Sequence, residues 1–211
     1  TMVDISYLGF DMHNPGLTER SQALDAVYIP FDGMNEAGLA VGMNAISHGE
    51  ARLDPQQPTI DSLAIIRLLL DQTASVEEAL TLLEGYNVDF GNGPPIHYLI
   101  ADASGNSVVI EYIDNEMHVL DPEYPGWQIS TNFLLSEHPA EQWPQVCNRY
   151  RTAAETLDTH DGRLDSDAAM SLLENVSQGN TRWSVIYYME SGEIALVMGR
   201  DYDDVLHFKL R

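Results

Sequence analysis

Two residues of this chain could act as a nucleophile, and they stand in different settings. Cys147 is the sole cysteine, and Thr1 is the first residue. A thiol attacks a carbonyl carbon as its thiolate, whereas a threonine at a chain start can be activated by its own α-amino group. Cys147 lies in a stretch expected to be helical, and free cysteines are usually small buried hydrophobic residues. We therefore do not expect Cys147 to be catalytic, and we keep a Thr1-dependent hydrolase as an alternative.

Histidine could supply metal ligands or a general base, but the seven histidines are dispersed along the chain. They show no HExxH or comparable ligand spacing. A single cysteine also excludes an intrachain disulfide and a multi-cysteine metal site. We therefore expect no metal and no cofactor. His97, on a predicted strand, is expected to satisfy a hydrogen bond in the core.

Composition and charge limit the classes of partner. The 211 residues include 33 acidic and 10 basic side chains, so the formal net charge is −23. That charge repels phosphate backbones and anionic lipid surfaces, and no apolar run reaches the length of a membrane span. We expect neither a nucleic-acid nor a membrane partner. The composition is typical of a globular protein, and we expect a single domain over residues 1–211, with a homo-oligomer left open.

The elements that must position these residues alternate between strand-rich and helix-rich stretches. Period-two alternation and turn residues predict the strands, and apolar faces with a period near 3.6 predict the helices. Antiparallel hairpins separated from helical pairs favour an α+β fold, a four-layer αββα sandwich of two antiparallel sheets with helices outside. The expected strands are residues 1–9, 25–31, 38–46, 97–101, 107–112, 117–120, 128–131, 183–188, 194–198 and 205–210, and the expected helices are residues 60–70, 75–83, 141–157 and 165–176.

The first eight residues alternate like a strand that is already under way. Because strand edges need partners, this beginning resembles a cut, and we expect a preceding segment to complete the fold. Any targeting signal would lie in that segment. The sequence therefore leaves the cellular location open, with the cytoplasm favoured.

Residues 32–44 read DGMNEAGLAVGMN, which closely resembles the signature DGMNEKGL…GLN of choloylglycine hydrolases and penicillin V acylases. Three further segments match in the same order. Residues 97–111 resemble the family's hairpin H…ISD..G.SVVVE, and residues 130–133 resemble its strand end LTN.P.F. Residues 148–150, Asn-Arg-Tyr, resemble its helix start SRF. The chain therefore resembles the linear amide hydrolases of the N-terminal-nucleophile (Ntn) class over nearly its whole length, with the first strands of that fold missing.

The resemblance implies a mechanism and three site residues. Family members attack an amide carbonyl with an N-terminal cysteine whose own α-amino group acts as base, and water resolves the acyl-enzyme. Asn132 would donate its side-chain amide to the developing oxyanion, and the backbone N–H of Asn44 would be the second donor. Arg149 would lie close to the nucleophile as a charged, orienting group. The cysteine, and the Arg and Asp that follow it in the family, are expected in the segment before Thr1.

The resemblance also implies the substrate class, a small N-acyl amide such as a conjugated bile salt, penicillin V, an acyl-homoserine lactone or an N-acyl amino acid or amine. The connection between Asn132 and Arg149 is short, whereas bile-salt-hydrolysing relatives carry a longer insertion there that helps to assemble tetramers. This difference argues against bile-salt specificity and against that tetramer. Two alternatives stay open: acyl transfer to an amine on the same fold, and a non-catalytic binding domain. Without its nucleophile the chain alone is expected to be inactive.

Overall fold

The computed structural model describes residues 1–4, 16–51 and 53–211. Its central feature is a five-stranded antiparallel sheet with the order β1-β2-β5-β6-β7. Because β2 pairs with β5 rather than with the next strand in the sequence, segments about 50 residues apart become neighbours, as the pairing of Asn44 with His97 illustrates. The strands are β1 (Asp32–Met34), β2 (Ala40–Ala45), β5 (Ile96–Ala101), β6 (Ser107–Ile113) and β7 (Glu116–Leu120).

A second antiparallel sheet is formed near the C-terminus, with the order β10-β9-β8. Strand β8 is therefore an edge of this sheet among the described strands. A small parallel pair, β3 with β4, flanks the first two long helices. The strands are β8 (Trp183–Tyr188), β9 (Glu193–Met198), β10 (Val205–Lys209), β3 (Thr59–Asp61) and β4 (Asn87–Asp89).

The helices fall into three groups along the chain. Two short ones precede β1, two lie between β3 and β4, and the rest connect the two sheets. They are α1 (Leu17–Ala23), the 3₁₀ helix η2 (Leu24–Tyr28), α2 (Ala64–Gln72), α3 (Val76–Glu84), the 3₁₀ helix η3 (Ala140–Gln142), α4 (Trp143–Val146), α5 (Asn148–Thr159) and α6 (Ser166–Asn175).

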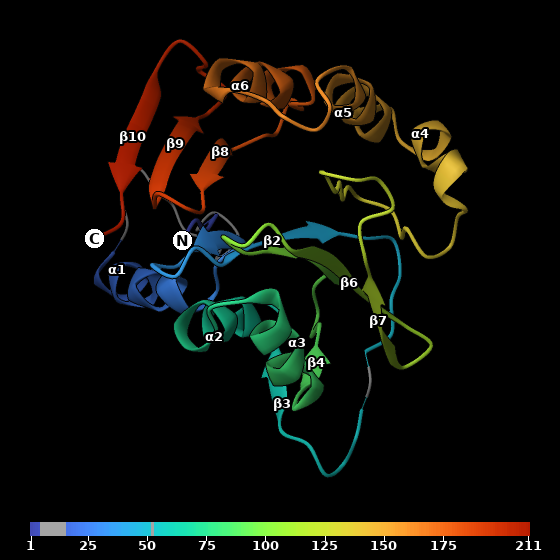
Figure 1. Ribbon diagram of the computed structural model, residues 1–211. Coiled ribbons are helices and arrows are strands. Elements are labelled where there is room, and N and C mark those ends of the chain that lie inside the picture. Colours follow the sequence, from blue (N-terminus) through green and yellow to red (C-terminus); the bar gives the residue numbers. More distant parts are fainter. Residues whose placement is uncertain (5–15, 52) are drawn as a thin grey trace.

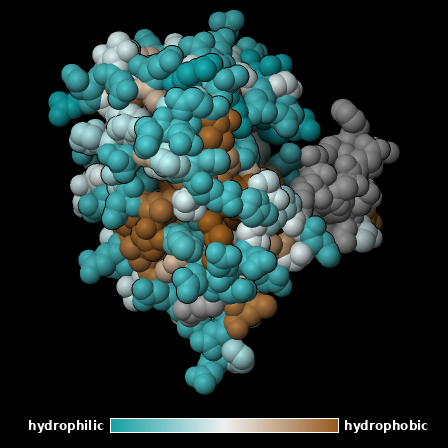
Figure 2. Space-filling view, turned by 90° about the vertical axis from the view of Figure 1, so that its right-hand side faces the viewer, coloured by the Kyte–Doolittle hydropathy of each residue, from teal (hydrophilic) through white to brown (hydrophobic). Residues whose placement is uncertain are grey.

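These elements form the layers that the sequence predicted (Figure 1). Helices α2 and α3 cover one face of the five-stranded sheet and share with it the largest apolar core. Val109 of β6 packs with α5 on the opposite face, and α6 packs on β8 and β9. Figure 2 shows hydrophilic side chains surrounding smaller hydrophobic areas on one face of the molecule. The α+β fold with helices outside two antiparallel sheets is thus confirmed.

Side chains cap the start of α3 in the structure. Ser75 Oγ accepts from the backbone N–H of Glu78 at 3.2 Å, and Glu78 Oε2 accepts from the N–H of Ala74 at 2.8 Å. These bonds satisfy N–H groups that have no partner within the helix. The local sequence therefore determines where α3 begins.

The strand predicted at residues 25–31 is wrong. Residues 24–28 form the 3₁₀ helix η2, in which only Ala26 is buried. The backbone bonds locally there, since the N–H of Ile29 donates to the Ala26 carbonyl at 3.1 Å. Of the strand predicted at residues 1–9, Met2 forms one isolated bridge with Asp32, and residues 5–9 lie outside the described residues.

Two further predictions need correction. Residues 128–131 form an irregular segment instead of a strand. The single helix predicted at residues 141–157 is divided, because Cys147 is extended, with φ −138° and ψ 121°, and separates α4 from α5. Strands β1, β3 and β4 were not predicted, and with three residues each they are too short to show an alternating pattern.

Candidate functional site

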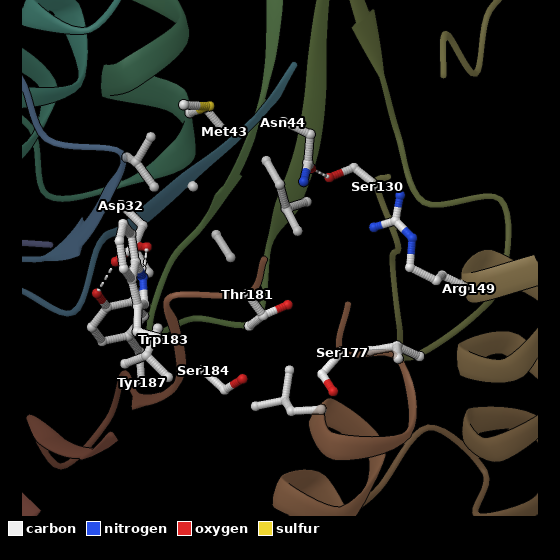
Figure 3. Close-up of a pocket in the computed structure, with 18 residues that line it drawn as sticks. Asp32, Met43, Asn44, Ser130, Arg149, Ser177, Thr181, Trp183, Ser184 and Tyr187 are labelled. Atoms are coloured by element: carbon white, nitrogen blue, oxygen red, sulfur yellow. Dashed lines mark hydrogen bonds between the residues drawn. The ribbon is translucent and has the colours of Figure 1, made fainter. Parts of the chain in front are cut away.

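A cavity of about 480 Å³ lies between the two sheets (Figure 3). Its walls come from β2 and β5 of the five-stranded sheet, from β8, and from the end of α6. Figure 3 shows Asn44, Ser130 and Arg149 together on one side, with Asp32 and Tyr187 on the other. The cavity therefore has two polar ends that can be considered separately.

Arg149 and Asn132 form a hydrogen-bonded pair at the first end. Arg149 Nη2 donates to Asn132 Oδ1 at 2.6 Å, and Asn132 Nδ2 donates to the carbonyl of Ala45 at 2.7 Å. When the amide of Gln178 is oriented with its oxygen toward the guanidinium, that oxygen accepts from Arg149 Nε at 2.8 Å. An amide nitrogen has two N–H groups, so one N–H of Asn132 remains available to a ligand.

Asn44 reaches the same end from β2. Its Oδ1 accepts a hydrogen bond from Ser130 Oγ at 2.7 Å, and Ser130 lies two residues before Asn132. The structure therefore brings together all three residues that the sequence singled out, Asn44, Asn132 and Arg149, although they come from a strand, an irregular segment and a helix start. The additional residue is Ser130, whose position inside the matched segment 130–133 was its only signal.

Cys147 lies near this group without lining the cavity described above. It precedes α5 as its N-cap residue and is half-buried. Burial acts to raise the pKa of its thiol, but the Thr131 hydroxyl, the backbone N–H groups of Tyr150 and Arg149, and the charge of Arg149 together lower it. The predicted helical position is thus corrected to a helix start. Thr1, the other candidate nucleophile, packs beside Gly33.

The second end of the cavity holds a half-buried carboxyl group, Asp32, that was not among the site residues predicted from the sequence. Asp32 Oδ2 accepts from Trp183 Nε1 at 2.7 Å, and Asp32 Oδ1 accepts from the Tyr187 hydroxyl at 2.5 Å. Burial raises the pKa of Asp32, and the two hydrogen bonds only partly oppose that effect. Burial, and then the neighbouring Asp32, also raise the pKa of Tyr187. In the sequence, Asp32 was only the first residue of the matched segment 32–44, and an aspartate is usually exposed.

A smaller cavity of about 280 Å³ borders β2 with mainly apolar side chains. Met43 and Ala45 of β2 line it together with Phe31, Leu63 and Phe90. Since the carbonyl of Ala45 accepts from Asn132, this apolar space adjoins the polar group described above.

Neither a group of metal ligands nor a membrane-spanning helix is present within the described ranges 1–4, 16–51 and 53–211. There, no three or more His, Cys, Asp or Glu side chains are grouped to hold a metal ion. No helix in that part of the chain is long and apolar enough to cross a membrane.

Comparison with known structures shows the fold. Penicillin V acylase from Agrobacterium tumefaciens matches with a TM-score of 0.66 and 22% identity, over 88% of this chain and 67% of that one. Two mutants of conjugated bile acid hydrolase from Clostridium perfringens match with TM-scores of 0.62 and 0.63 and with 19% and 18% identity. Each match covers 86% of this chain and 73% of the hydrolase. The chain thus has the Ntn-hydrolase fold.

Sequence comparison supplies the family. An uncharacterised protein of Paramecium bursaria Chlorella virus 1 is 31% identical over 99 residues, which are 43% of this chain and 36% of the viral protein. The chain thus matches little more than a third of that relative's length. The profile of the linear amide C–N hydrolases, choloylglycine hydrolase family, matches residues 21–162, which is more than half of the chain. The chain therefore belongs to the choloylglycine hydrolase family of linear amide C–N hydrolases.

Proposed function

We propose that the protein hydrolyses the linear amide C–N bond of an N-acyl compound through a cysteine acyl-enzyme. The observation that supports this proposal is that Asn44 and Arg149 line one end of the cavity between the sheets, where Arg149 donates to Asn132. Amide donors and a guanidinium in one place can stabilise the negative charge that develops on a carbonyl oxygen during acyl transfer.

The nucleophile is proposed to be an N-terminal cysteine on a segment outside this chain. Its α-amino group takes the thiol proton, and the thiolate attacks the carbonyl carbon to form a C–S bond. The C–N bond then breaks, and the leaving amine takes the proton. Water next attacks the thioester, which releases the carboxylic acid and regenerates the thiol. Cys147 has no part in this scheme, because it is an internal residue without a free α-amino group and does not line the cavity.

The edge of β8 that pairs with no described strand is where that segment is proposed to bind. Trp183, Val185 and Tyr187 of β8 line the cavity, and β9 occupies the other edge of the strand. A strand added along β8 would complete backbone hydrogen bonds that an edge strand leaves open. It would also place its first residue in the cavity that Arg149 lines.

Asn132 and the backbone N–H of Asn44 are proposed to donate to the oxyanion, and Arg149 to orient Asn132. Loss of one such donor typically lowers turnover by about 10²–10³. The acyl part of the substrate is proposed to occupy the apolar cavity beside Met43 and Ala45, because apolar surface buried there is favourable. Penicillin V and N-acyl amino acids or amines fit this description.

The test uses the full-length protein with its native N-terminus. Intact mass establishes whether the mature chain begins with cysteine, and released amine is measured with penicillin V, glycocholate, an N-acyl-homoserine lactone and an N-acyl amino acid. We expect amine release from at least one of them, a kcat about 10²–10³-fold lower in Asn132→Ala, and unchanged turnover in Cys147→Ser. The absence of amine release from every substrate, or inactivation by Cys147→Ser, would overturn the proposal.

A further inference from the structure

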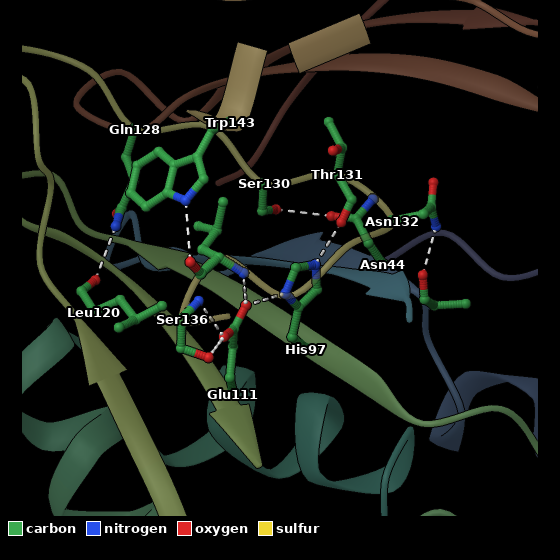
Figure 4. A network of polar contacts seen from close by, with 12 residues as sticks. Asn44, His97, Glu111, Leu120, Gln128, Ser130, Thr131, Asn132, Ser136 and Trp143 are labelled. Carbon is green, nitrogen blue, oxygen red and sulfur yellow. Dashed lines mark hydrogen bonds and ion pairs between the residues drawn. The ribbon is translucent and has the colours of Figure 1, made fainter. Parts of the chain in front are cut away.

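His97 and Glu111 form a fully buried pair directly beneath the segment that contains Asn132 (Figure 4). His97 Nδ1 lies 3.0 Å from Glu111 Oε1, and both side chains have no exposed surface. His97 Nε2 lies 2.7 Å from the Thr131 carbonyl oxygen. Both ring nitrogens therefore have partners, which confirms the hydrogen bonding expected of His97 in the core.

The partners of this pair keep Glu111 ionised. The two ring nitrogens of His97 face oxygen atoms, one of the Glu111 carboxylate and one of the Thr131 carbonyl. Burial acts to raise the pKa of Glu111, but bonds from His97, from the Ser136 hydroxyl and from the N–H groups of Leu135 and Ser136 outweigh it and lower the pKa. Glu111 is therefore a carboxylate that accepts from His97, Leu135 and Ser136.

His97 and Glu111 form hydrogen bonds with the segment 128–136 on both sides of Asn132. His97 holds the carbonyl of the preceding residue, Thr131. Glu111 Oε1 accepts from the N–H of Leu135 at 2.8 Å, while Oε2 accepts from the N–H and the hydroxyl of Ser136 at 3.1 and 2.6 Å. Because residues 128–136 belong to no strand or helix, these bonds replace a backbone ladder in fixing the segment.

The same histidine connects this segment to the other proposed oxyanion donor. In the β2–β5 pairing, His97 lies opposite Asn44. Three consecutive residues of the segment are thus attached to β2 and β5: Ser130 to the Asn44 side chain, Thr131 to His97, and Asn132 to the Ala45 carbonyl. The distance between the two proposed donors depends on these attachments.

We propose that His97 and Glu111 are positioning residues, which hold the Asn132 amide at the correct distance from Asn44 for oxyanion binding. The inference rests on the proposed function, in which Asn132 donates to the oxyanion. A buried carboxylate and its polar partners are costly to desolvate, and such a network often contributes little net stability, so its benefit here lies in orientation. Displacing a catalytic group by about 1 Å can lower turnover about 10²-fold.

The test compares His97→Gln with Ile65→Ala in the full-length enzyme. Glutamine can donate to only one side at a time, so the segment loses part of its attachment. Ile65 lies in the core between α2 and the five-stranded sheet, on the face opposite to the segment 128–136. The Ile65→Ala variant should therefore be destabilised without a change in that segment. At a temperature where both variants are folded, we expect His97→Gln to lower kcat about 10- to 100-fold with a nearly constant KM, while Ile65→Ala retains kcat.

A double-mutant cycle with Asn132→Ala separates this inference from the proposed function. If His97 acts through Asn132, His97→Gln adds little further loss once Asn132 is alanine. If His97→Gln lowers kcat equally in the wild-type and Asn132→Ala backgrounds, the positioning role of His97 is overturned and the oxyanion role of Asn132 is left intact. A full kcat in Asn132→Ala alone overturns the proposed function itself. Should His97→Gln fail to fold, Ser136→Ala, which removes one donor to Glu111, takes its place in the cycle with the same outcomes.

Discussion

Gly38 leads the chain into β2 with a φ of 81°, a conformation that residues with a side chain rarely adopt. It also lies against the second sheet. A Cβ built on Gly38 would be 2.3 Å from the carbonyl oxygen of Met189, in the turn between β8 and β9. Glycine at this position therefore allows both the turn before β2 and a close backbone contact between the two sheets.

Replacing Gly38 by alanine should be more destabilising than a positive φ alone explains. Gly105 is the matched control, because its φ is 87° and a Cβ there meets nothing within 4 Å. We expect Gly105→Ala to cost about 1–2 kcal/mol from backbone strain and Gly38→Ala about 2–5 kcal/mol, since steric overlap is added. Urea unfolding of the two variants measures the difference. Equal costs would show that Met189 moves aside without penalty.

At the scale of elements, Asp102 connects the β5–β6 hairpin to the start of α3. Its Oδ2 accepts from the N–H of Val76 at 3.0 Å, and its Oδ1 accepts from the N–H of Ser104 at 2.9 Å. Burial acts to raise the pKa of Asp102, but the hydrogen bonds from Val76, Asn106 and Ser104 outweigh it and lower the pKa. A carboxylate at a helix N-terminus also interacts favourably with the helix dipole.

Asp102 should therefore contribute stability that depends on pH. Since its folded-state pKa is lowered, its contribution is present above the ordinary aspartate pKa of about 3.9 and is lost as the pH falls below it. We expect Asp102→Asn to lower the free energy of unfolding by about 1–3 kcal/mol at pH 7. This difference from the wild-type protein should become smaller toward pH 3. Urea titrations at both pH values measure the free energy of unfolding. As a control, Asp203→Asn, which changes an exposed side chain, should leave it equal to that of the wild-type protein. A difference between Asp102→Asn and wild type that does not change with pH would contradict the assignment.

At the scale of the whole molecule, two sheets of the same acidic chain are held together around a cavity. Asp32 of β1 bonds to Trp183 and Tyr187 of β8, and the ring of Phe31 lies 6.2 Å from that of Trp183. These contacts join the sheets at one end of the cavity, while Asn44 and Arg149 line the other. The cavity therefore results from the packing of the two sheets against each other.

The net charge of −23 should make the stability depend on salt. Like charges repel in the compact state, and salt shortens the range of that repulsion from about 30 Å at 0.01 M to about 3 Å at 1 M. We expect the Tm at pH 7 to rise by roughly several degrees between 0.01 and 0.5 M NaCl. KCl should act equally, because screening depends on ionic strength. A Tm that stays constant or falls would show that local ion pairs outweigh the overall repulsion.

The sequence by itself determined the elements whose information is local. The hairpin β5–β6–β7, the helices α2, α3 and α6, and the cap at Ser75 follow from periodicity and turn residues within a few positions. The matched segments also identified Asn44, Asn132 and Arg149 as site residues, and their roles remain predictions. Local patterns suffice for these elements because the burial of their side chains repeats with the period of the helix or the strand.

The tertiary structure alone decided how those residues meet. The segment 128–136 has no periodicity, because its conformation is imposed by His97 and Glu111 from a distant hairpin. The burial of Asp32 depends on Trp183 and Tyr187, about 150 residues later. Hydrogen bonds between side chains so far apart leave no repeating pattern in the sequence, and only the packing of the two sheets brings the partners within reach.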